Sequence, residues 1–324
     1  MNLLKYQSDF LAYLNRQNFN LQPYNLYKPI EYVMHLGGKR IRPVLTLMAS
    51  DIISGNYKQA LPAALAIEVF HNFTLIHDDI MDKAFLRRKA KTVHNKWNIN
   101  TAILSGDAML ILAYRYFESY NPTVFKNLVC LMSNAAIKIC QGQQWDIDFE
   151  TQSNISVEQY LKMIGLKTSV LIATALKMGA VVAEADMQEA EYLYKYGFNL
   201  GMAFQLQDDY LDTFGKSDTF GKQIGGDIAA NKKTYLYLKA LEVSKQSDKQ
   251  TLSTLYNDKQ QVNTDHKLSN VISIFKKNRI PFYTQQLIED YTDKAIGYLE
   301  LLSISKQAKD ALRIFSENLM RRKV

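Results

Sequence analysis

Apolar residues recur at every third or fourth position along most of the chain, which predicts a succession of amphipathic helices. From residue 62 to residue 81 they form one core-facing stripe, made of Leu65, Val69, Phe70, Phe73 and Ile76. The same spacing predicts helices over residues 101–118, 124–140, 157–182, 187–211 and 234–243. A sustained alternation of apolar and polar residues, which is typical of strands, is absent from the sequence. The pattern therefore predicts an all-α fold.

Two segments interrupt the helical spacing. Residues 213–233 contain Gly215, Gly221, Gly225 and Gly226 and end next to a pair of lysines. We interpret this segment as a flap that carries positive charge over an anionic site. Residues 244–267 are polar, so we expect a surface connection there.

Proline placement favours long helices within one domain. None of the six prolines lies between Pro122 and Pro281, and an interval without proline suits uninterrupted helices. Hydrophobic residues make up 47% of the chain, enough for a large core. No shift in composition marks a linker. We therefore expect a single domain over residues 1–324.

Charge and cysteine content narrow the classes of function. The net charge of +7 favours anionic small molecules over nucleic acid, because the basic residues nearest the acidic clusters lie in ordered motifs. Cys130 and Cys140 are the only cysteines, which indicates a reducing compartment, and we interpret both as apolar core residues. Neither a signal peptide nor a segment long enough to span a membrane is evident, so we expect a cytoplasmic protein without an integral membrane segment.

Two acidic clusters share one internal spacing: Asp78-Asp79-Ile80-Met81-Asp82 and Asp208-Asp209-Tyr210-Leu211-Asp212. In a helix the first and last aspartates of each cluster lie one turn apart on the same face. Like charges at this spacing destabilise an isolated helix, so the repetition predicts a bound cation. Mg²⁺ binds one or two carboxylates together with the oxygens of a substrate phosphate. The clusters therefore indicate chemistry on diphosphates.

Further motifs follow in a fixed order between residues 37 and 233. They are Gly37-Gly38-Lys39-Arg40-Ile41-Arg42-Pro43, His71, Arg87-Arg88, Thr92-Val93-His94, Gly106-Asp107, Gly142-Gln143, Lys167-Thr168, Gln205, Gly225-Gly226-Asp227-Ile228 and Lys232-Lys233-Thr234. With the two acidic clusters, this order resembles the trans-isoprenyl diphosphate synthases of the polyprenyl synthetase family. The resemblance implies the isoprenoid synthase fold, an all-α bundle around a central active-site cavity, and a homodimer.

The resemblance also implies a reaction and its metal. An allylic diphosphate loses its diphosphate, and the double bond of isopentenyl diphosphate attacks the resulting cation. Several Mg²⁺ ions, for which Mn²⁺ is a possible substitute, neutralise the leaving group. By resemblance, the metal ligands are Asp78, Asp82, Asp208 and Asp212. The catalytic residues are Asp78, Asp79, Asp82, Lys167, Thr168, Gln205 and Asp208.

Two substrate sites follow from the same resemblance. Isopentenyl diphosphate, which must not ionise, is expected to bind cations without metal: Lys39, Arg42, His71 and Arg88, with Gly38 allowing close approach of the backbone. The allylic diphosphate is expected to contact Arg87, Lys167, Thr168, Gln205, Lys222 and Lys232. His71 could instead be a satisfied core histidine, and Lys167 and Lys232 could be exposed surface lysines.

Two further features of the basic segments stay open. Relatives usually follow the paired arginines with a glycine, any residue and a proline, whereas this chain has Lys89-Ala90-Lys91. The loop could therefore have a different shape and alter how Arg88 is presented. The terminal Arg321-Arg322-Lys323 resembles a basic tail that some relatives fold over the second substrate, with a frayed terminus as the alternative.

Product length should depend on the helix that ends at Asp78. One turn before that aspartate lie Phe73 and Thr74, with Phe70 one turn further, and a turn of about 5.4 Å is roughly one five-carbon unit. A bulky Phe73 above a small Thr74 resembles synthases that make geranylgeranyl diphosphate, with farnesyl diphosphate as the alternative. A terpene cyclase or a non-catalytic synthase subunit would be expected to lack one of the acidic clusters.

Overall fold

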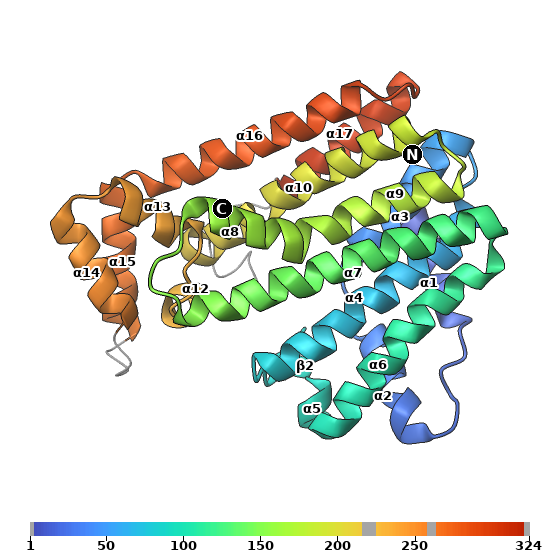
Figure 1. Ribbon diagram of the computed structural model, residues 1–324, viewed down its shortest axis with the longest axis horizontal. Helices are drawn as coiled ribbons and strands as arrows, with labels where there is room; N and C mark the ends of the chain where they lie inside the picture. The colour runs from blue at the N-terminus through green and yellow to red at the C-terminus, as the bar shows by residue number, and fades with distance from the viewer. Residues whose placement is uncertain (1–2, 216–224, 258–263, 321–324) are drawn as a thin grey trace. The chain divides into compact units, whose positions relative to one another are not determined.

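The computed structural model describes residues 3–215, 225–257 and 264–320, and helices dominate these ranges (Figure 1). The predicted all-α fold is confirmed. Contacts within the chain separate it into two compact units. The first unit comprises Met1–Ser133, Thr174–Leu193 and Ser303–Ser305; the second comprises Asn134–Ala173, Tyr194–Leu302 and Lys306–Val324. The single domain expected over residues 1–324 stays a prediction.

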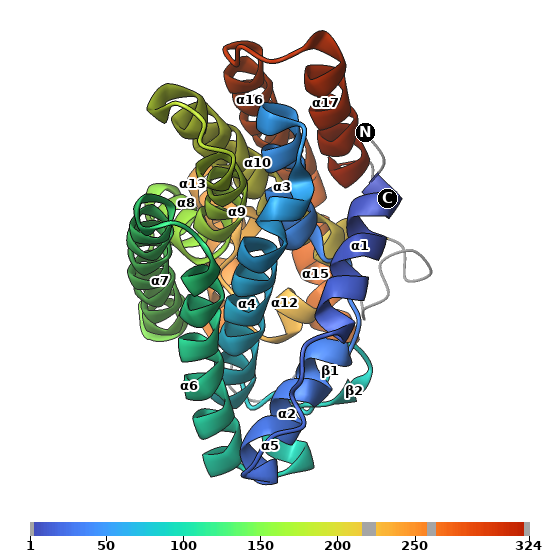
Figure 2. The same cartoon turned by 90° about the vertical axis from the view of Figure 1, so that its right-hand side faces the viewer.

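The first unit is built around one buried helix. Its elements are α1 (Leu3–Asn15), α2 (Tyr24–His35), α3 (Ile41–Ser54), η1 (Tyr57–Ala60), α4 (Leu61–Met81), α5 (Val93–Lys96), α6 (Ile99–Arg115) and η2 (Tyr116–Ser119). Helix α4 packs beside α3 and α6 (Figure 2). Residues 63–70 of α4 are buried on every side, and all of them except Glu68 are apolar.

A buried ion pair joins three helices of this unit. Arg40 precedes α3 in the left-handed backbone region, at φ 49°, and its side chain is turned inward. Its guanidinium donates to the carboxylate of Glu68 on α4 and to the carbonyl of Met34 on α2. Both charged side chains are almost fully buried. This pair fixes the start of α3, and therefore the segment that leads to Arg42, against α4.

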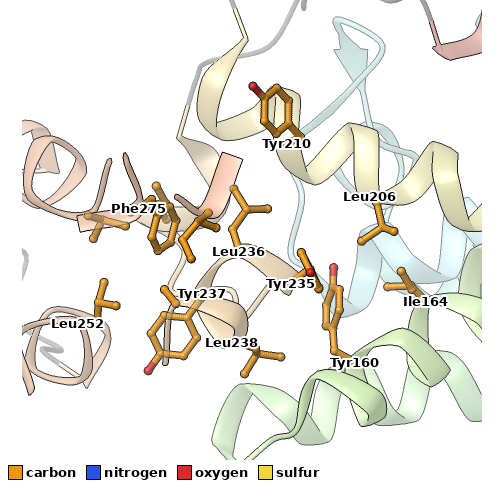
Figure 3. Packing of buried hydrophobic residues seen from close by; sticks show 14 of the residues in the cluster. Tyr160, Ile164, Leu206, Tyr210, Tyr235, Leu236, Tyr237, Leu238, Leu252 and Phe275 are labelled. Atoms are coloured by element: carbon orange, nitrogen blue, oxygen red, sulfur yellow. The ribbon is translucent and has the colours of Figure 1, made fainter. Parts of the chain in front are cut away.

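The second unit gathers the remaining helices. They are α8 (Val157–Ile164), a π-helical turn (Gly165–Ser169), α12 (Gly226–Ala229), α13 (Tyr235–Val243), α14 (Gln246–Asn257), α15 (Thr264–Lys277), α16 (Ile280–Glu300) and α17 (Lys306–Met320). Helices α7 (Pro122–Thr151), α9 (Val170–Val182) and α10 (Met187–Phe214) contribute residues to both units. The core of the second unit includes Tyr160, Leu206, Leu236, Leu252 and Phe275, one from each of five helices (Figure 3).

The predicted helices are present with altered ends. The prediction over residues 124–140 is too short, because α7 continues to Thr151. The prediction over residues 157–182 covers α8, the π-helical turn and α9. Proline placement agrees with this outcome, since Pro122 opens α7 and Pro281 lies in the first turn of α16.

Two predictions about local structure are wrong. Residues 244–267 are not a plain connection, because α14 forms there and buries Leu252 and Tyr256 in the core. Cys130 and Cys140 are exposed, because they lie off the buried stripe of α7. That stripe consists of Leu128, Met132, Ala135 and Ile139.

A short hairpin also went unpredicted. Strands β1 (Leu86–Arg87) and β2 (Ala90–Lys91) pair antiparallel, and Arg88 and Lys89 form the two-residue turn between them. Both turn residues have positive φ, 52° and 65°, which glycine adopts without strain. A residue other than glycine in this left-handed region costs about 1–2 kcal/mol, which applies to Lys89.

Within the part of the chain that the structure describes, three helices are long and apolar enough to cross a membrane by length and composition: Tyr57–Met81, Pro122–Thr151 and Val157–Val182. The prediction that no segment reaches this length is wrong. Burial inside the protein covers 61%, 28% and 72% of their apolar windows, respectively. Packing against other helices thus accounts for much of the apolar composition of the first and third, and the absence of a membrane segment stays a prediction.

Removing the Glu68 carboxylate should destabilise the first unit strongly. Glu68→Ala leaves the Arg40 guanidinium buried without its counter-charge, and we expect a loss of about 3–5 kcal/mol in the free energy of unfolding, measured by urea titration. Glu118→Ala is the matched control, because Glu118 pairs with Arg115 on the exposed surface, and it should change stability by less than about 0.5 kcal/mol. Equal effects of the two substitutions would contradict the assignment of Arg40 and Glu68 as a structural pair.

Candidate active site

The first acidic cluster ends helix α4. Asp78 is half-buried and Asp82 is exposed, and they lie four residues apart on one face. Asp79 is 4% exposed and binds Arg87, whose Nε lies 2.8 and 2.9 Å from the two carboxylate oxygens. The pair is compatible with a supporting role for Asp79, and it leaves Asp78 and Asp82 as the carboxylates of the cluster that reach its surface.

Basic side chains gather seven residues earlier along α4. Arg42 at the start of α3 lies 3.1 Å from His71, measured from Nη1 to Nε2. Arg88 donates to the carbonyl of Gly37 and lies against Gly38, where a Cβ atom would come within 2.9 Å of the guanidinium carbon. Gly38 also has φ +126°, which disfavours any other residue. The structure thus brings together four of the five residues predicted to bind isopentenyl diphosphate, and the fifth, Lys39, adjoins Gly38 in sequence.

The basic cluster sets the charge of its histidine. Burial, followed by the charges of Arg42 and Arg88, holds the pKa of His71 well below its usual range. Burial lowers the pKa of Arg42 to about 10, with Glu68 opposing this shift and Arg88 adding to it. A neutral His71 therefore lies among charged guanidinium groups, and its Nε2 accepts from Arg42. Such an arrangement attracts an anion.

The second acidic cluster lies near the end of α10, in the second unit. Asp208 is half-buried, whereas Asp209 and Asp212 are buried. One carboxylate oxygen of Asp212 accepts from the backbone N–H of Asp227 at 2.9 Å, and the backbone carbonyl of Asp212 accepts from the N–H of Gly225 at 2.6 Å. Asp212 thus fixes the start of α12, which follows the glycine-rich segment.

Lys167 is held by a residue that the sequence did not single out. Its Nζ lies 2.6 Å from a carboxylate oxygen of Asp146 on α7. At Gly142, one turn before Asp146, a Cβ atom would meet the Lys167 backbone nitrogen at 2.4 Å, so only glycine permits this approach. Lys167 also lies in the π-helical turn, a feature frequent at functional sites. The four-residue spacing between Gly142 and Asp146 was the available signal in the sequence.

Thr168 and Gln205 belong to a chain of hydrogen bonds. The Thr168 hydroxyl donates to Gln205 at 3.1 Å, and the Gln205 amide donates to Asp209 at 3.0 Å. The hydroxyl of Tyr160, a second residue that sequence reasoning missed, donates to the other oxygen of Asp209 at 2.5 Å. Burial and the charge of Asp227 raise the pKa of Asp209 well above its usual range, while the bonds from Tyr160 and Gln205 lower it.

The remaining basic candidates differ in placement. Lys232 Nζ lies 3.9 Å from a carboxylate oxygen of Asp227 and is largely exposed. Its neighbour Lys233 donates to the carbonyls of Phe149, Glu150 and Gln152 and so caps the end of α7. Lys222, residues 216–224 of the predicted flap and the basic tail Arg321-Arg322-Lys323 lie outside the described residues.

The candidate chain-length residues are packed side by side on α4. The ring centre of Phe73 lies 5.5 Å from that of Phe70 and 4.9 Å from that of His77. His77 in turn lies 3.2 Å from the carbonyl of Ile103 on α6, measured from Nε2. The Thr74 hydroxyl donates to the carbonyl of His71 at 2.8 Å, so its methyl group is left as the contacting surface. Phe73 is therefore held in place on the side of α4 that faces α6.

Both acidic clusters offer the donors that Mg²⁺ prefers. Within residues 3–215, 225–257 and 264–320, no three or more histidine, cysteine, aspartate or glutamate side chains converge as a ready metal site. The chemistry of the donor set nevertheless fits the ion, because Asp78, Asp82 and Asp208 present carboxylate oxygens at or near the surface. Carboxylates held this way repel one another until a cation binds.

Comparisons with known proteins agree with the arrangement. Residues 23–274 match the family model described as polyprenyl synthetase. The chain is 34% identical to a short chain isoprenyl diphosphate synthase of Methanothermobacter thermautotrophicus, over 99% of this chain and 98% of that protein. It is similar to a crystal structure of a geranylgeranyl pyrophosphate synthase, with 48% identity, TM-score 0.96 and full coverage of both chains. A polyprenyl synthase of Caulobacter crescentus, complexed with calcium and isoprenyl diphosphate, is 28% identical with TM-score 0.86, over 99% of this chain and 97% of that one.

The low pKa of His71 should make stability depend on pH. Because the folded state keeps the imidazole neutral below pH 6.5 while the unfolded state takes up a proton, stability is present above that pH and is lost as the pH falls. We expect His71 to contribute a loss of up to about 1.4 kcal/mol per pH unit just below pH 6.5. Midpoints of urea unfolding at pH 7.5 and pH 5.5 measure this pH dependence of stability. The substitution His71→Asn should remove the contribution of His71 to it. An unchanged pH dependence in the variant would contradict the assignment.

Proposed function

The chain belongs to the polyprenyl synthetase family, whose members are enzymes that transfer prenyl groups, and we propose which prenyl transfer it performs. It condenses isopentenyl diphosphate head-to-tail with dimethylallyl, geranyl and farnesyl diphosphates. The product is a short-chain all-trans prenyl diphosphate, geranylgeranyl diphosphate in the first place. The 48% identity to a geranylgeranyl pyrophosphate synthase supports this product over farnesyl diphosphate.

One observation carries the proposal: a single face of α4 serves two kinds of diphosphate site. His71 and Asp78 are seven residues apart, which is nearly two turns and about 10 Å along the axis. At His71 the neighbours are guanidinium groups, and at Asp78 they are carboxylates. A diphosphate with constant charge fits the first position. A diphosphate that leaves, and therefore needs a divalent cation, fits the second.

The basic cluster holds isopentenyl diphosphate. Arg42 and Arg88 bind its oxygens, Lys39 adds a third cation, and Gly38 lets backbone N–H groups approach. A neutral His71 keeps the Arg42 guanidinium oriented without adding charge. No metal is needed here, because the substrate keeps its diphosphate throughout the reaction.

The acidic clusters hold the metal for the allylic diphosphate. Asp78 and Asp82 of the first cluster would bind Mg²⁺, and so would Asp208 and Asp212 of the second cluster. When bound, the ions neutralise the charge that develops on the departing diphosphate. Asp79 supports this site by fixing Arg87.

Side chains of the second unit complete the allylic site. Lys167, oriented by Asp146, and Lys232 contact the diphosphate, and we assign Lys222 the same role from its sequence motif. Thr168 and Gln205 place oxygen atoms where they stabilise the short-lived carbocation. The departed diphosphate then takes the proton, so no protein base is required.

The exposed surface of α6 supports the proposed homodimer. Ile99, Ile103, Leu104 and Ile111 are between 41% and 62% exposed along this one helix. Large apolar side chains grouped on one exposed helix are typical of interfaces between subunits. A second copy of the chain covers them in the proposed assembly, which we place in the cytoplasm.

An assay with purified protein tests the function. With Mg²⁺, isopentenyl diphosphate and each allylic primer, we expect geranylgeranyl diphosphate as the main product, and no product after chelation of the metal. Asp78→Ala or Asp208→Ala should lower turnover at least about a hundredfold and leave the helical content unchanged. Asp293→Ala on the exposed part of α16 is the control and should retain wild-type turnover. Near-normal rates in either acidic-cluster variant would overturn the mechanism.

Product length should respond to Phe73. In this proposal the Phe73 ring limits the space for the growing chain about one helical turn before Asp78. Phe73→Ala should therefore shift the products toward chains longer by at least one five-carbon unit. Chromatography of the dephosphorylated products measures the shift. Phe10→Leu, a change in the core of α1, is the control and should leave the product distribution as in the wild type. If Phe73→Ala also leaves it unchanged, Phe73 is a packing residue and not the floor.

A further inference from the structure

We propose that Tyr160 is a positioning residue, which fixes the orientation of the Gln205 amide and thereby directs the lone pairs of the Thr168 hydroxyl toward the carbocation. The inference rests on the proposed function, because it assigns Thr168 and Gln205 to the cation. Tyr160 does not touch the substrate in this account. It acts through Asp209, the middle aspartate of the second acidic cluster.

The contacts form one unbranched relay within the second unit. Tyr160 Oη lies 2.5 Å from Asp209 Oδ2, and Gln205 Nε2 lies 3.0 Å from Asp209 Oδ1. Thr168 Oγ1 lies 3.1 Å from Gln205 Oε1. The relay therefore joins α8, α10 and the π-helical turn. Each of the two Asp209 oxygens has one donor in it.

The relay has a fixed direction. Burial and the charge of Asp209 raise the pKa of Tyr160 well above its usual range, so its hydroxyl keeps its proton and donates. Asp209 accepts from the Tyr160 hydroxyl on Oδ2 and from the Gln205 NH₂ group on Oδ1, so the Gln205 carbonyl faces Thr168. The single hydroxyl hydrogen of Thr168 then points at Gln205. Its two lone pairs are left for the opposite side.

Because Tyr160 and Asp209 are buried, water cannot easily replace the hydrogen bond from the Tyr160 hydroxyl. Tyr160 is 5% exposed and Asp209 is 4% exposed. Figure 3 shows the Tyr160 ring among Ile164, Leu206 and Tyr235, with its hydroxyl directed toward α10. Without that hydroxyl, Asp209 Oδ2 would lose a buried donor. The carboxylate would then be free to turn and to release the Gln205 amide.

The orientation of the amide matters because its two ends carry opposite partial charges. An oxygen lone pair stabilises a nearby cation, whereas an N–H or O–H hydrogen destabilises it. If the amide reversed, its NH₂ group would face Thr168, and Thr168 would turn its hydrogen outward. Tyr160 thus acts on the step in which the cation forms and leaves the binding of diphosphate unchanged.

Tyr160→Phe tests the inference, with Tyr196→Phe as the matched control. Tyr196 is also a fully buried tyrosine of the second unit, and its hydroxyl bonds to Leu312 and Ser316. Both variants lose one buried hydroxyl, so both should show a similar fall in melting temperature. We expect kcat to fall about tenfold in Tyr160→Phe, with KM for both substrates within twofold of the wild type, and kcat to change less than twofold in Tyr196→Phe. Equal kcat values in the two variants would overturn the inference.

A double-mutant cycle separates positioning from general damage. Thr168→Val removes the hydroxyl that the relay orients, so adding Tyr160→Phe to it should lower kcat by less than a further twofold. If the effects of the two substitutions multiply instead, Tyr160 does not act through Thr168 and the inference fails. Wild-type turnover is the reference in the same assay. Its absence would refute the proposed function itself, whereas a failed cycle in an active enzyme refutes only the role of Tyr160.

Discussion

Like charges held side by side are the constraint on which both candidate half-sites depend. Each acidic cluster places three carboxylates within five residues, and in both clusters the middle one is held by donors from elsewhere in the chain. Arg87 binds Asp79 in the first unit, and Tyr160 with Gln205 binds Asp209 in the second. The middle aspartate is therefore bound by an arginine in the first cluster and by two neutral hydrogen-bond donors in the second. The outer aspartates of the first cluster, Asp78 and Asp82, reach the surface and offer the carboxylate oxygens that a divalent cation prefers.

The basic cluster follows the same rule with the signs reversed. Arg40, Arg42 and Arg88 repel one another, and Glu68 is the buried carboxylate that opposes their charge. His71 avoids a further positive charge by remaining neutral. A diphosphate would supply the negative charge that the exposed part of this cluster lacks. Buried Glu68 and neutral His71 thus hold the guanidinium groups in place, and an anionic ligand would balance the remaining positive charge.

Periodicity was enough to predict the long helices of the middle of the chain, and motif order supplied the candidate site residues, whose roles stay predictions. The stripe over residues 62–81 matches α4 because its apolar spacing determines which face is buried. The polar composition of residues 244–267 led to a wrong prediction, because burial of only two large side chains, Leu252 and Tyr256, is enough to dock α14 on the core. The hairpin at Arg88 and Lys89 escaped prediction because neither residue is a usual turn former at positive φ.

Partners of the motif residues could not be predicted, because they come from distant parts of the chain. Asp146 and Lys167 are 21 residues apart, and Tyr160 and Asp209 are 49 apart. A motif identifies the side chain that faces a ligand. The second residue that orients this side chain can be any hydrogen-bond donor or acceptor that lies close enough in the folded protein. Tyr160 reads in the sequence as one more apolar position of α8. Only its burial against a carboxylate distinguishes it from a core tyrosine, and that property belongs to the fold.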